Sequence, residues 1–503
     1  MGQNMSDESD YELARERQSV CRLDDDIDEF LKHYRDNEAV PASERRLLIL
    51  FPGGLGSALP RARERFTGDV NQTFSFEDYW ITPKLFFGDE IAHAEMRGEL
   101  DHESKFIVPD GTVGFCGITP YNRFVEWCRR KHLDVFIFGY DWRRRANHSV
   151  RFFLDTFLPY LLKSISDAGL TAPSDITLLG HSLGGMIVKL IAHDPRLPFG
   201  QIRRFITVGT PFYGYAGHTR RYFEGEPFFF LNKKSEVARI IATLRGGYYL
   251  QFLDAETYKR NKRLLAADPE FPLKSYPSLD ADMKGQPADP FDTTVKRGQY
   301  RYPRYVDLTE VAHAKGESQG IAADLPATIV AKFYNLRGVQ VSGGKAQNGT
   351  NITQTWARVP DSFDPDEDEL PITFCAGAGD GATPAWAGWL ASLRSQQPGN
   401  VVTFKGDLQH MLLLEYPEIQ DSIFRLLHPD VYPVPIAPVD VQISTAIPVA
   451  SPAETQAFVQ RMRETGGPEA ARADFLKLPL ERRVPLIYGV FTALVRGFGP
   501  ATG

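Results

Sequence analysis

Residues 176–194 read ITLLGHSLGGMIVKLIAHD, and this stretch decides the fold prediction. The apolar run at 176–180 is typical of a strand that is buried on both faces of a sheet. The apolar spacing after residue 182 predicts a helix that starts at once. Between them stands G-x-S-x-G, a motif whose serine needs a strand before it and a helix after it. We therefore predict that Ser182 is a nucleophile on a tight turn; a turn that contains serine by chance is the alternative.

Similar apolar runs recur along the chain. Helical patterns separate them, two of which lie at 121–131 and 150–166. Alternating buried strands and helices predict an α/β fold with a mostly parallel central sheet. Besides 176–180, the predicted strands are 46–51, 135–140, 205–209, 372–375 and 401–404.

Segments that break this alternation define the expected organisation. The stretch after residue 212 is rich in aromatic and charged residues, and we expect it to be helical near 235–252. Its part around Glu226–Leu231, which carries three successive Phe, is expected to be a mobile lid over Ser182; a static cap is the alternative. A surface excursion is expected at 343–370. The expected parts are an acidic N-terminal tail or short surface helix at 1–40, the first part of the core at 41–212, a cap or lid insertion at 213–326, the second part of the core at 327–430 and a C-terminal extension at 431–503.

Composition excludes several classes of protein. The 503 residues include only 4 Cys, too few for a disulfide framework. The net charge of −7 is concentrated in residues 1–40, so no global basic field exists to hold a nucleic acid. Neither paired-Cys nor HExxH spacing occurs, and we expect no metal and no cofactor.

Targeting signals are sparse. The start has no apolar segment of a signal peptide, and no window reaches the roughly 18 apolar residues of a membrane-spanning helix. We expect a cytoplasmic protein, with peripheral membrane contact left open. Gly2 matches the loose pattern for N-myristoylation, which also stays open. The apolar run at 484–495 is expected to be a helix docked on the core; an interfacial helix is the alternative.

The partners of Ser182 follow from chain order. In a fold with this motif, the acid and then the histidine come after the serine. His410 follows the strand predicted at 401–404, on a loop, and is the candidate base. Asp380 follows the strand predicted at 372–375 and is the candidate acid, although an Asp before Gly is also common in turns. The histidines considered and set aside are His181, His193, His218, His313 and His428, and the competing acidic run is 364–369.

A glycine-rich loop follows the first predicted strand. It reads PGGLGS at 52–57, and a backbone N–H there can approach a substrate oxygen. Gly54 is the candidate donor of an oxyanion hole, together with the backbone N–H of Leu183. A phosphate-binding loop would need a following Lys, and a dinucleotide loop a third Gly, so the sequence fits neither.

Taken together, these motifs resemble the lecithin:cholesterol acyltransferase-like branch of the α/β-hydrolases, which includes phospholipid:diacylglycerol acyltransferases and related phospholipases. The motifs are PGGLGS at 52–57, ITP at 118–120, YDWR at 140–143, GHSLGG at 180–185, GTPFYG at 209–214 and GDG at 379–381. The resemblance implies an α/β-hydrolase fold with Ser182, Asp380 and His410 as the triad. The sequence differs from the family in GDGATP at 379–384. Within YDWR, an Asp141–Arg143 ion pair that braces the loop is favoured over a catalytic role.

The leading functional hypothesis is a serine esterase or O-acyltransferase that acts on a phospholipid or acylglycerol through an acyl-enzyme. Its partners are a lipid ester, a lipid alcohol as an alternative acceptor to water, and transiently a membrane surface. Two alternatives stay open: a non-catalytic scaffold of the same fold that binds lipid or protein, and a soluble esterase without lipid specificity.

Overall fold

The computed structural model describes a defined set of residues, and all structural statements concern these. They are 23–24, 26–41, 45–65, 73–80, 109, 111–114, 117–198, 200–214, 238–239, 241–251, 254–265, 306–342, 345–346, 353–358, 373–465 and 468–496. The expected lid segment at 226–231, the acidic run at 364–369, His218 and Gly2 lie outside the described residues.

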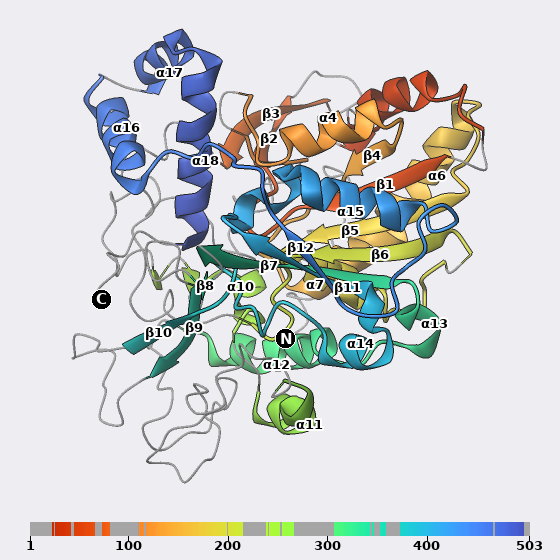
Figure 1. Ribbon diagram of the computed structural model, residues 1–503. Helices are drawn as coiled ribbons and strands as arrows, with labels where there is room; N and C mark the ends of the chain where they lie inside the picture. Colours follow the sequence, from red (N-terminus) through yellow and green to blue (C-terminus); the bar gives the residue numbers. More distant parts are fainter. Residues whose placement is uncertain are drawn as a thin grey trace, which may run out of the picture.

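A parallel sheet of seven strands forms the centre of the molecule (Figure 1). Its order is β12-β11-β7-β6-β5-β1-β4, and a short strand, β8 (Lys345–Ala346), pairs with β7 in the antiparallel direction. This is the α/β-hydrolase-like fold that the sequence predicts, with β5 in the interior of the sheet and the motif at 180–185 leading from its end into the helix that follows. The strands are β1 (Arg46–Phe51), β4 (Asp134–Ile137), β5 (Asp175–His181), β6 (Ile202–Val208), β7 (Phe333–Ser342), β11 (Val401–Gly406) and β12 (Val439–Gln442).

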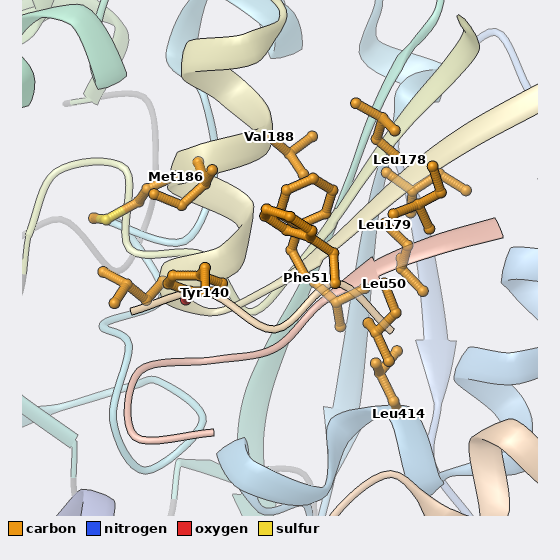
Figure 2. Packing of buried hydrophobic residues seen from close by; sticks show 14 of the residues in the cluster. Leu50, Phe51, Tyr140, Leu178, Leu179, Met186, Val188 and Leu414 are labelled. Carbon is orange, nitrogen blue, oxygen red and sulfur yellow. The ribbon is translucent and has the colours of Figure 1, made fainter. Parts of the chain in front are cut away.

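Helices cover both faces of this sheet. The alternation of side chains along β1 separates the two faces: Phe51 points toward Val188 of α7 (Leu183–Ile191), whereas Leu50 points toward Leu414 of η6 (His410–Glu415) (Figure 2). On the first face, Phe51 also packs against Phe153, with ring centroids 5.1 Å apart. The helices of this face are α5 (Ala146–Arg151), η2 (Phe152–Phe157), α6 (Leu158–Asp167) and α7; those of the other are α4 (Asn122–Arg130), η6 and α15 (Pro417–Leu427).

The remaining described elements lie around this core. They are β2 (Leu59–Arg65), β3 (Thr73–Trp80), α10 (Arg245–Tyr248), α11 (Ala255–Leu265), α12 (Leu308–Ile321), α13 (Ala327–Val330), β9 (Thr353–Arg358), β10 (Thr373–Gly377), α14 (Ala391–Gln396), η5 (Pro398–Asn400), α16 (Pro452–Glu464), α17 (Pro468–Lys477) and α18 (Leu480–Arg496).

The part of the N-terminal region that the structure describes includes a short helix, the second of the two forms expected for residues 1–40. Residues 26–36 are helical, and one side of this helix is buried through Ile27, Phe30, Leu31 and Tyr34. The ring of Phe30 lies 5.4 Å from that of Phe136 on β4. The spacing of these apolar residues is that of one helix face, and the many acidic residues occupy the other positions.

The strand predicted at 372–375 is present, but it does not join the central sheet. It corresponds to β10, which pairs in the antiparallel direction with β9, a strand inside the expected excursion. The sheet position belongs to β7, which the sequence analysis missed. The polar side chains of β7 interrupt its apolar pattern. Asn335 is fully buried and donates to the Thr207 hydroxyl, and Gln340 donates to the carbonyl of Leu408 at 2.6 Å. An apolar-run criterion does not detect such a strand.

The C-terminal extension packs on the core through α18. The side chains of Ile487, Tyr488, Val490 and Phe491 are buried, so this helix is docked, as predicted, rather than laid in an interface. Figure 1 shows α16, α17 and α18 grouped at one side of the sheet. Among the described residues, no helix has the length and apolar character needed to cross a membrane.

Candidate active site

Ser182 stands on a strained turn between β5 and α7. Its backbone has φ 53° and ψ −120°, a conformation that a residue with a side chain rarely adopts. The turn is fixed by a hydrogen bond from the Ser182 N–H to the carbonyl of Val208 at 2.8 Å, and the side chain is half-buried. The strain therefore presents the serine hydroxyl at the carboxyl edge of the sheet.

The three glycines of GHSLGG are required by close backbone approach. A Cβ on Gly180 would lie 2.4 Å from the Cα of Gly185, and one on Gly185 would lie 1.8 Å from the hydroxyl of Thr210. A Cβ on Gly184 would lie 2.2 Å from the carbonyl oxygen of Phe51. None of the three has a positive φ. The motif thus brings α7 directly against the end of β1 and the loop that follows it.

The structure brings Ser182, His410 and Asp380 together. The Ser182 hydroxyl lies 2.8 Å from Nε2 of His410, and Nδ1 of His410 lies 2.8 Å from Oδ2 of Asp380. His410 is 4% and Asp380 1% exposed. Because a carboxylate accepts from Nδ1–H, Nε2 of the neutral ring carries the lone pair, and the serine hydroxyl donates to it.

Asp380 is held by a turn of its own. Its Oδ1 accepts the backbone N–H of Thr383 at 2.7 Å and that of Ala382 at 3.1 Å, which leaves Oδ2 facing the histidine. Gly381, at φ 99°, permits this turn. The main chains also meet, since the N–H of His410 donates to the carbonyl of Asp380 at 3.0 Å. The carboxylate is therefore oriented by two N–H groups on Oδ1 and by the histidine ring on Oδ2.

Gly209 lies against this group of side chains, a role that the sequence analysis missed. It has φ 60°, and a Cβ there would lie 3.2 Å from Oδ2 of Asp380 and 3.3 Å from Cε1 of His410. Its carbonyl accepts the hydroxyl of Thr383 at 2.8 Å. In the sequence, Gly209 is the first residue of GTPFYG at 209–214, a motif that the sequence analysis used only for the family resemblance.

The loop at 52–57 lies beside the serine, since a Cβ on Gly53 would lie 3.2 Å from Cβ of Ser182. Gly53 donates its N–H to the hydroxyl of Tyr121 at 2.8 Å, and Gly56 donates to the carbonyl of Gly53 at 2.9 Å. Neither bond uses the N–H of Gly54. A Cβ on Gly54 would lie 3.3 Å from Cδ2 of Leu183, so the two candidate oxyanion donors belong to neighbouring residues. Leu183 is the first residue of α7, where N–H groups have no acceptor within the helix and the helix dipole favours negative charge.

The YDWR segment holds this loop in place. The Arg143 guanidinium donates to both carboxylate oxygens of Asp141, at 2.8 Å each, and both side chains are buried. The Tyr140 hydroxyl donates to the carbonyl of Pro52 at 2.7 Å, and the Tyr140 N–H donates to Ser57 Oγ at 3.1 Å. These contacts favour the structural interpretation of the segment.

The other histidines make different contacts. His181 is fully buried, with its ring bonded to Tyr121 and to the carbonyl of His410. His193 bonds Lys189 near the end of α7, and His428 bonds the carbonyl of Phe424 at the end of α15. His313 lies on α12. Among the described residues, no group of three or more His, Cys, Asp or Glu side chains is placed to hold a metal ion.

Comparisons with known proteins place few constraints on the chain. No protein-family model matches it, and no curated protein matches it. A chain of the Tle4-Tli4 complex is similar, with 13% identity and a TM-score of 0.40, over 76% of this chain and 99% of that one. The lin2722 gene product of Listeria innocua aligns over 80% of this chain and 99% of its own, with 9% identity and a TM-score of 0.25. Likenesses this distant add nothing to the argument from geometry.

Proposed function

We propose that this protein is a serine hydrolase that acts on carboxylic esters through an acyl-enzyme. The observation that carries the proposal is the continuous path from the Ser182 hydroxyl through His410 to Asp380, with 2.8 Å at each step. Its position supports the same conclusion, because the serine projects from a strained turn that opens a helix. A nucleophile, a base and an orienting acid in this order are the elements of acyl transfer.

In the proposed mechanism, Ser182 Oγ attacks the acyl carbonyl while Nε2 of His410 takes the hydroxyl proton. Asp380 stabilises the imidazolium that forms. The carbonyl oxygen becomes negatively charged and accepts hydrogen bonds from the backbone N–H groups of Gly54 and Leu183. The C–O bond to the leaving alcohol then breaks, and His410 returns its proton to that alcohol. His410 then deprotonates an incoming water or alcohol, whose oxygen attacks the acyl carbonyl. The C–O bond to Ser182 Oγ breaks, and His410 returns the proton to Oγ.

The substrate class that we propose is a lipid ester, either a phospholipid or an acylglycerol. It is supported by the resemblance to the lecithin:cholesterol acyltransferase-like branch. Two of the segments that carry this resemblance, PGGLGS at 52–57 and YDWR at 140–143, also contact each other through Ser57 and Tyr140. With water as acceptor the product is a free acid; with a lipid alcohol the same acyl-enzyme makes the protein an O-acyltransferase.

The test of the nucleophile combines labelling with turnover. A fluorophosphonate probe should label the native protein at Ser182. Ser182→Ala should lose labelling and lose ester turnover by on the order of 10³-fold or more. Ser422→Ala is the matched control, since the Ser422 hydroxyl only bonds a carbonyl within α15. Unchanged turnover in Ser182→Ala would contradict the proposal, and a native protein that neither labels nor turns over would favour a non-catalytic scaffold.

The test of the substrate class compares physical states of the ester. Rates would be measured on a dissolved short-chain p-nitrophenyl ester and on phosphatidylcholine vesicles, with and without an added long-chain alcohol. Higher kcat/KM on vesicles supports a lipid esterase, and a new ester product with the alcohol supports acyl transfer. Activity confined to the dissolved ester would contradict the lipid assignment but leave the serine mechanism in place.

A further inference from the structure

Two buried side chains that the proposed mechanism does not use connect the oxyanion loop to His410. The Gly53 N–H donates to the Tyr121 hydroxyl at 2.8 Å, and this hydroxyl lies 2.9 Å from Nδ1 of His181. On the other side of the same ring, Nε2 of His181 lies 2.8 Å from the carbonyl oxygen of His410. The four groups form one unbroken chain of hydrogen bonds.

The direction of each bond in this chain is fixed by chemistry. A carbonyl oxygen only accepts, so Nε2 of His181 must carry a hydrogen. In the neutral ring Nδ1 then accepts, and the Tyr121 hydroxyl must be its donor. The Tyr121 oxygen is left to accept from Gly53. Every donor and acceptor in the chain is thereby used, with a single tautomer of His181.

Burial supports this neutral form. Tyr121 and His181 have no exposed surface, and the ring of His181 lies 5.2 Å from that of His410. Burial, followed by the nearby His410, lowers the pKa of His181 to about 3. Burial also raises the pKa of Tyr121 well above its usual value. When His410 becomes charged during the reaction, the neighbouring ring therefore stays uncharged.

We propose that Tyr121 and His181 are positioning residues that set the oxyanion loop and His410 in a fixed mutual geometry. This rests on the proposed function. On one side, the Gly53 N–H is used by its bond to Tyr121 and does not face the substrate. The next N–H, that of Gly54, is therefore the loop's donor to the substrate. On the other side, His181 holds the carbonyl of His410, whose N–H is held by the carbonyl of Asp380 at 3.0 Å.

The geometry predicts an effect on kcat. Both ends of the chain act on the transition state, the loop through the oxyanion and His410 through proton transfer. A small displacement of either end weakens these contacts more than it weakens substrate binding. Tyr121→Phe should lower kcat per labelled serine about 10- to 100-fold, with KM within about twofold of the native value.

Replacements of His181 separate the two halves of the chain. The amide nitrogen of Gln reaches the position of Nε2 and can donate to the His410 carbonyl, whereas the amide of Asn reaches only the position of Nδ1. We therefore expect His181→Gln to retain more of the native kcat than His181→Asn. In a double-mutant cycle, Tyr121→Phe should cost less once His181→Gln is present than in the native protein, because the glutamine has already lost the bond that the Tyr121 hydroxyl makes at Nδ1.

The control is another buried tyrosine hydroxyl. Tyr34 donates to the carbonyl of Thr171 at 2.6 Å, ahead of the amino end of β5 and thus at the opposite edge of the sheet from Ser182. Tyr34→Phe should lower Tm and leave kcat per labelled serine unchanged. If Tyr121→Phe behaves in the same way, or if Asn and Gln at position 181 are equivalent, the inference is wrong. Failure of the proposed function is separate, because it appears as missing activity in the native protein.

Discussion

The Tyr488 hydroxyl donates a hydrogen bond to the Glu415 carboxylate at 2.7 Å, and both side chains are buried. Glu415 is the last residue of η6, the helix that begins at His410, and Tyr488 lies on α18. The other carboxylate oxygen accepts the backbone N–H of Phe124 on α4 at 3.4 Å. The C-terminal extension is therefore joined to the element that carries the candidate base.

The first prediction concerns this carboxyl group and pH. Burial raises the pKa of Glu415 from 4.5 to about 7. Between these two values the folded state binds more protons than the unfolded state, so this group makes stability fall as pH rises through the window, with no further change above it. Glu415→Gln does not ionise. Its Tm relative to the native protein should therefore rise from about pH 5 to about pH 8.

Thermal unfolding at a series of pH values checks this. Glu317 gives a useful comparison, because burial raises its pKa to about 7 as well, on α12. Its contribution is present in both proteins and cancels in the difference. Parallel Tm curves for the native protein and Glu415→Gln would show that Glu415 has the same proton affinity folded and unfolded.

Sequence patterns predicted the parts of the fold whose physics is local. The strand 46–51 has the predicted ends, and the turn at Ser182 lies between the predicted strand and helix. In both places a continuous apolar run is followed by glycines, which the close approach of neighbouring backbone requires. The same kind of pattern placed His410, which follows β11, at the carboxyl edge of the sheet. Asp380 follows β10, a strand outside the central sheet, and reaches this edge through its contacts with His410.

The parts that escaped prediction depend on distant partners. The β7 strand is central although it carries Asn335, Arg337 and Gln340, because each of these finds acceptors from other segments. The hydrogen-bond chain through Tyr121 likewise cannot be predicted from the sequence. It joins Tyr121 to Gly53 and to His181, which are 68 and 60 positions away. Hydrogen bonds of this range leave no periodic signal along the chain.

The second prediction separates two histidines that both follow the nucleophile. His410→Ala should lower turnover about as much as Ser182→Ala, on the order of 10³-fold or more, because the members of such a group act as a unit. His428→Ala should be nearly silent, since this ring bonds only the carbonyl of Phe424 in the structure. Initial rates on a dissolved ester measure both. The opposite ranking would mean that the base has been assigned wrongly.

The third prediction concerns the Asp141–Arg143 pair. Both charges are buried and joined by two hydrogen bonds, so removing one deprives the other of this charged partner. Asp141→Asn should lower stability by about 3–5 kcal/mol. The double replacement Asp141→Asn with Arg143→Met should be less damaging than the single change, because no buried charge remains.

Urea unfolding gives these stabilities, and turnover per labelled serine gives the activity. If the pair only braces the loop, Asp141→Asn should change kcat far less than Tyr121→Phe does, provided that both are assayed where they are folded. A loss of kcat comparable to that of His410→Ala, without a loss of stability, would instead assign the pair to the chemistry.

The last prediction tests why glycine stands at position 184. A Cβ there would lie 2.2 Å from the carbonyl oxygen of Phe51 and 2.5 Å from that of Pro52, and backbone atoms of a central strand cannot move aside cheaply. Gly184→Ala should therefore push α7 away from the end of β1, which separates Leu183 from Gly54. We expect a loss of stability of about 1–3 kcal/mol or more from the forced shift. We also expect a fall in kcat, because the two proposed oxyanion donors move apart.

Gly316 is the matched control for Gly184: it lies exposed within α12, and a Cβ there meets nothing within 4 Å. Gly316→Ala should raise stability by about 0.5–1 kcal/mol through helix propensity, with native activity. If Gly184→Ala keeps the native Tm and kcat, the contact between α7 and β1 is looser than the structure has it, and close approach does not explain this glycine.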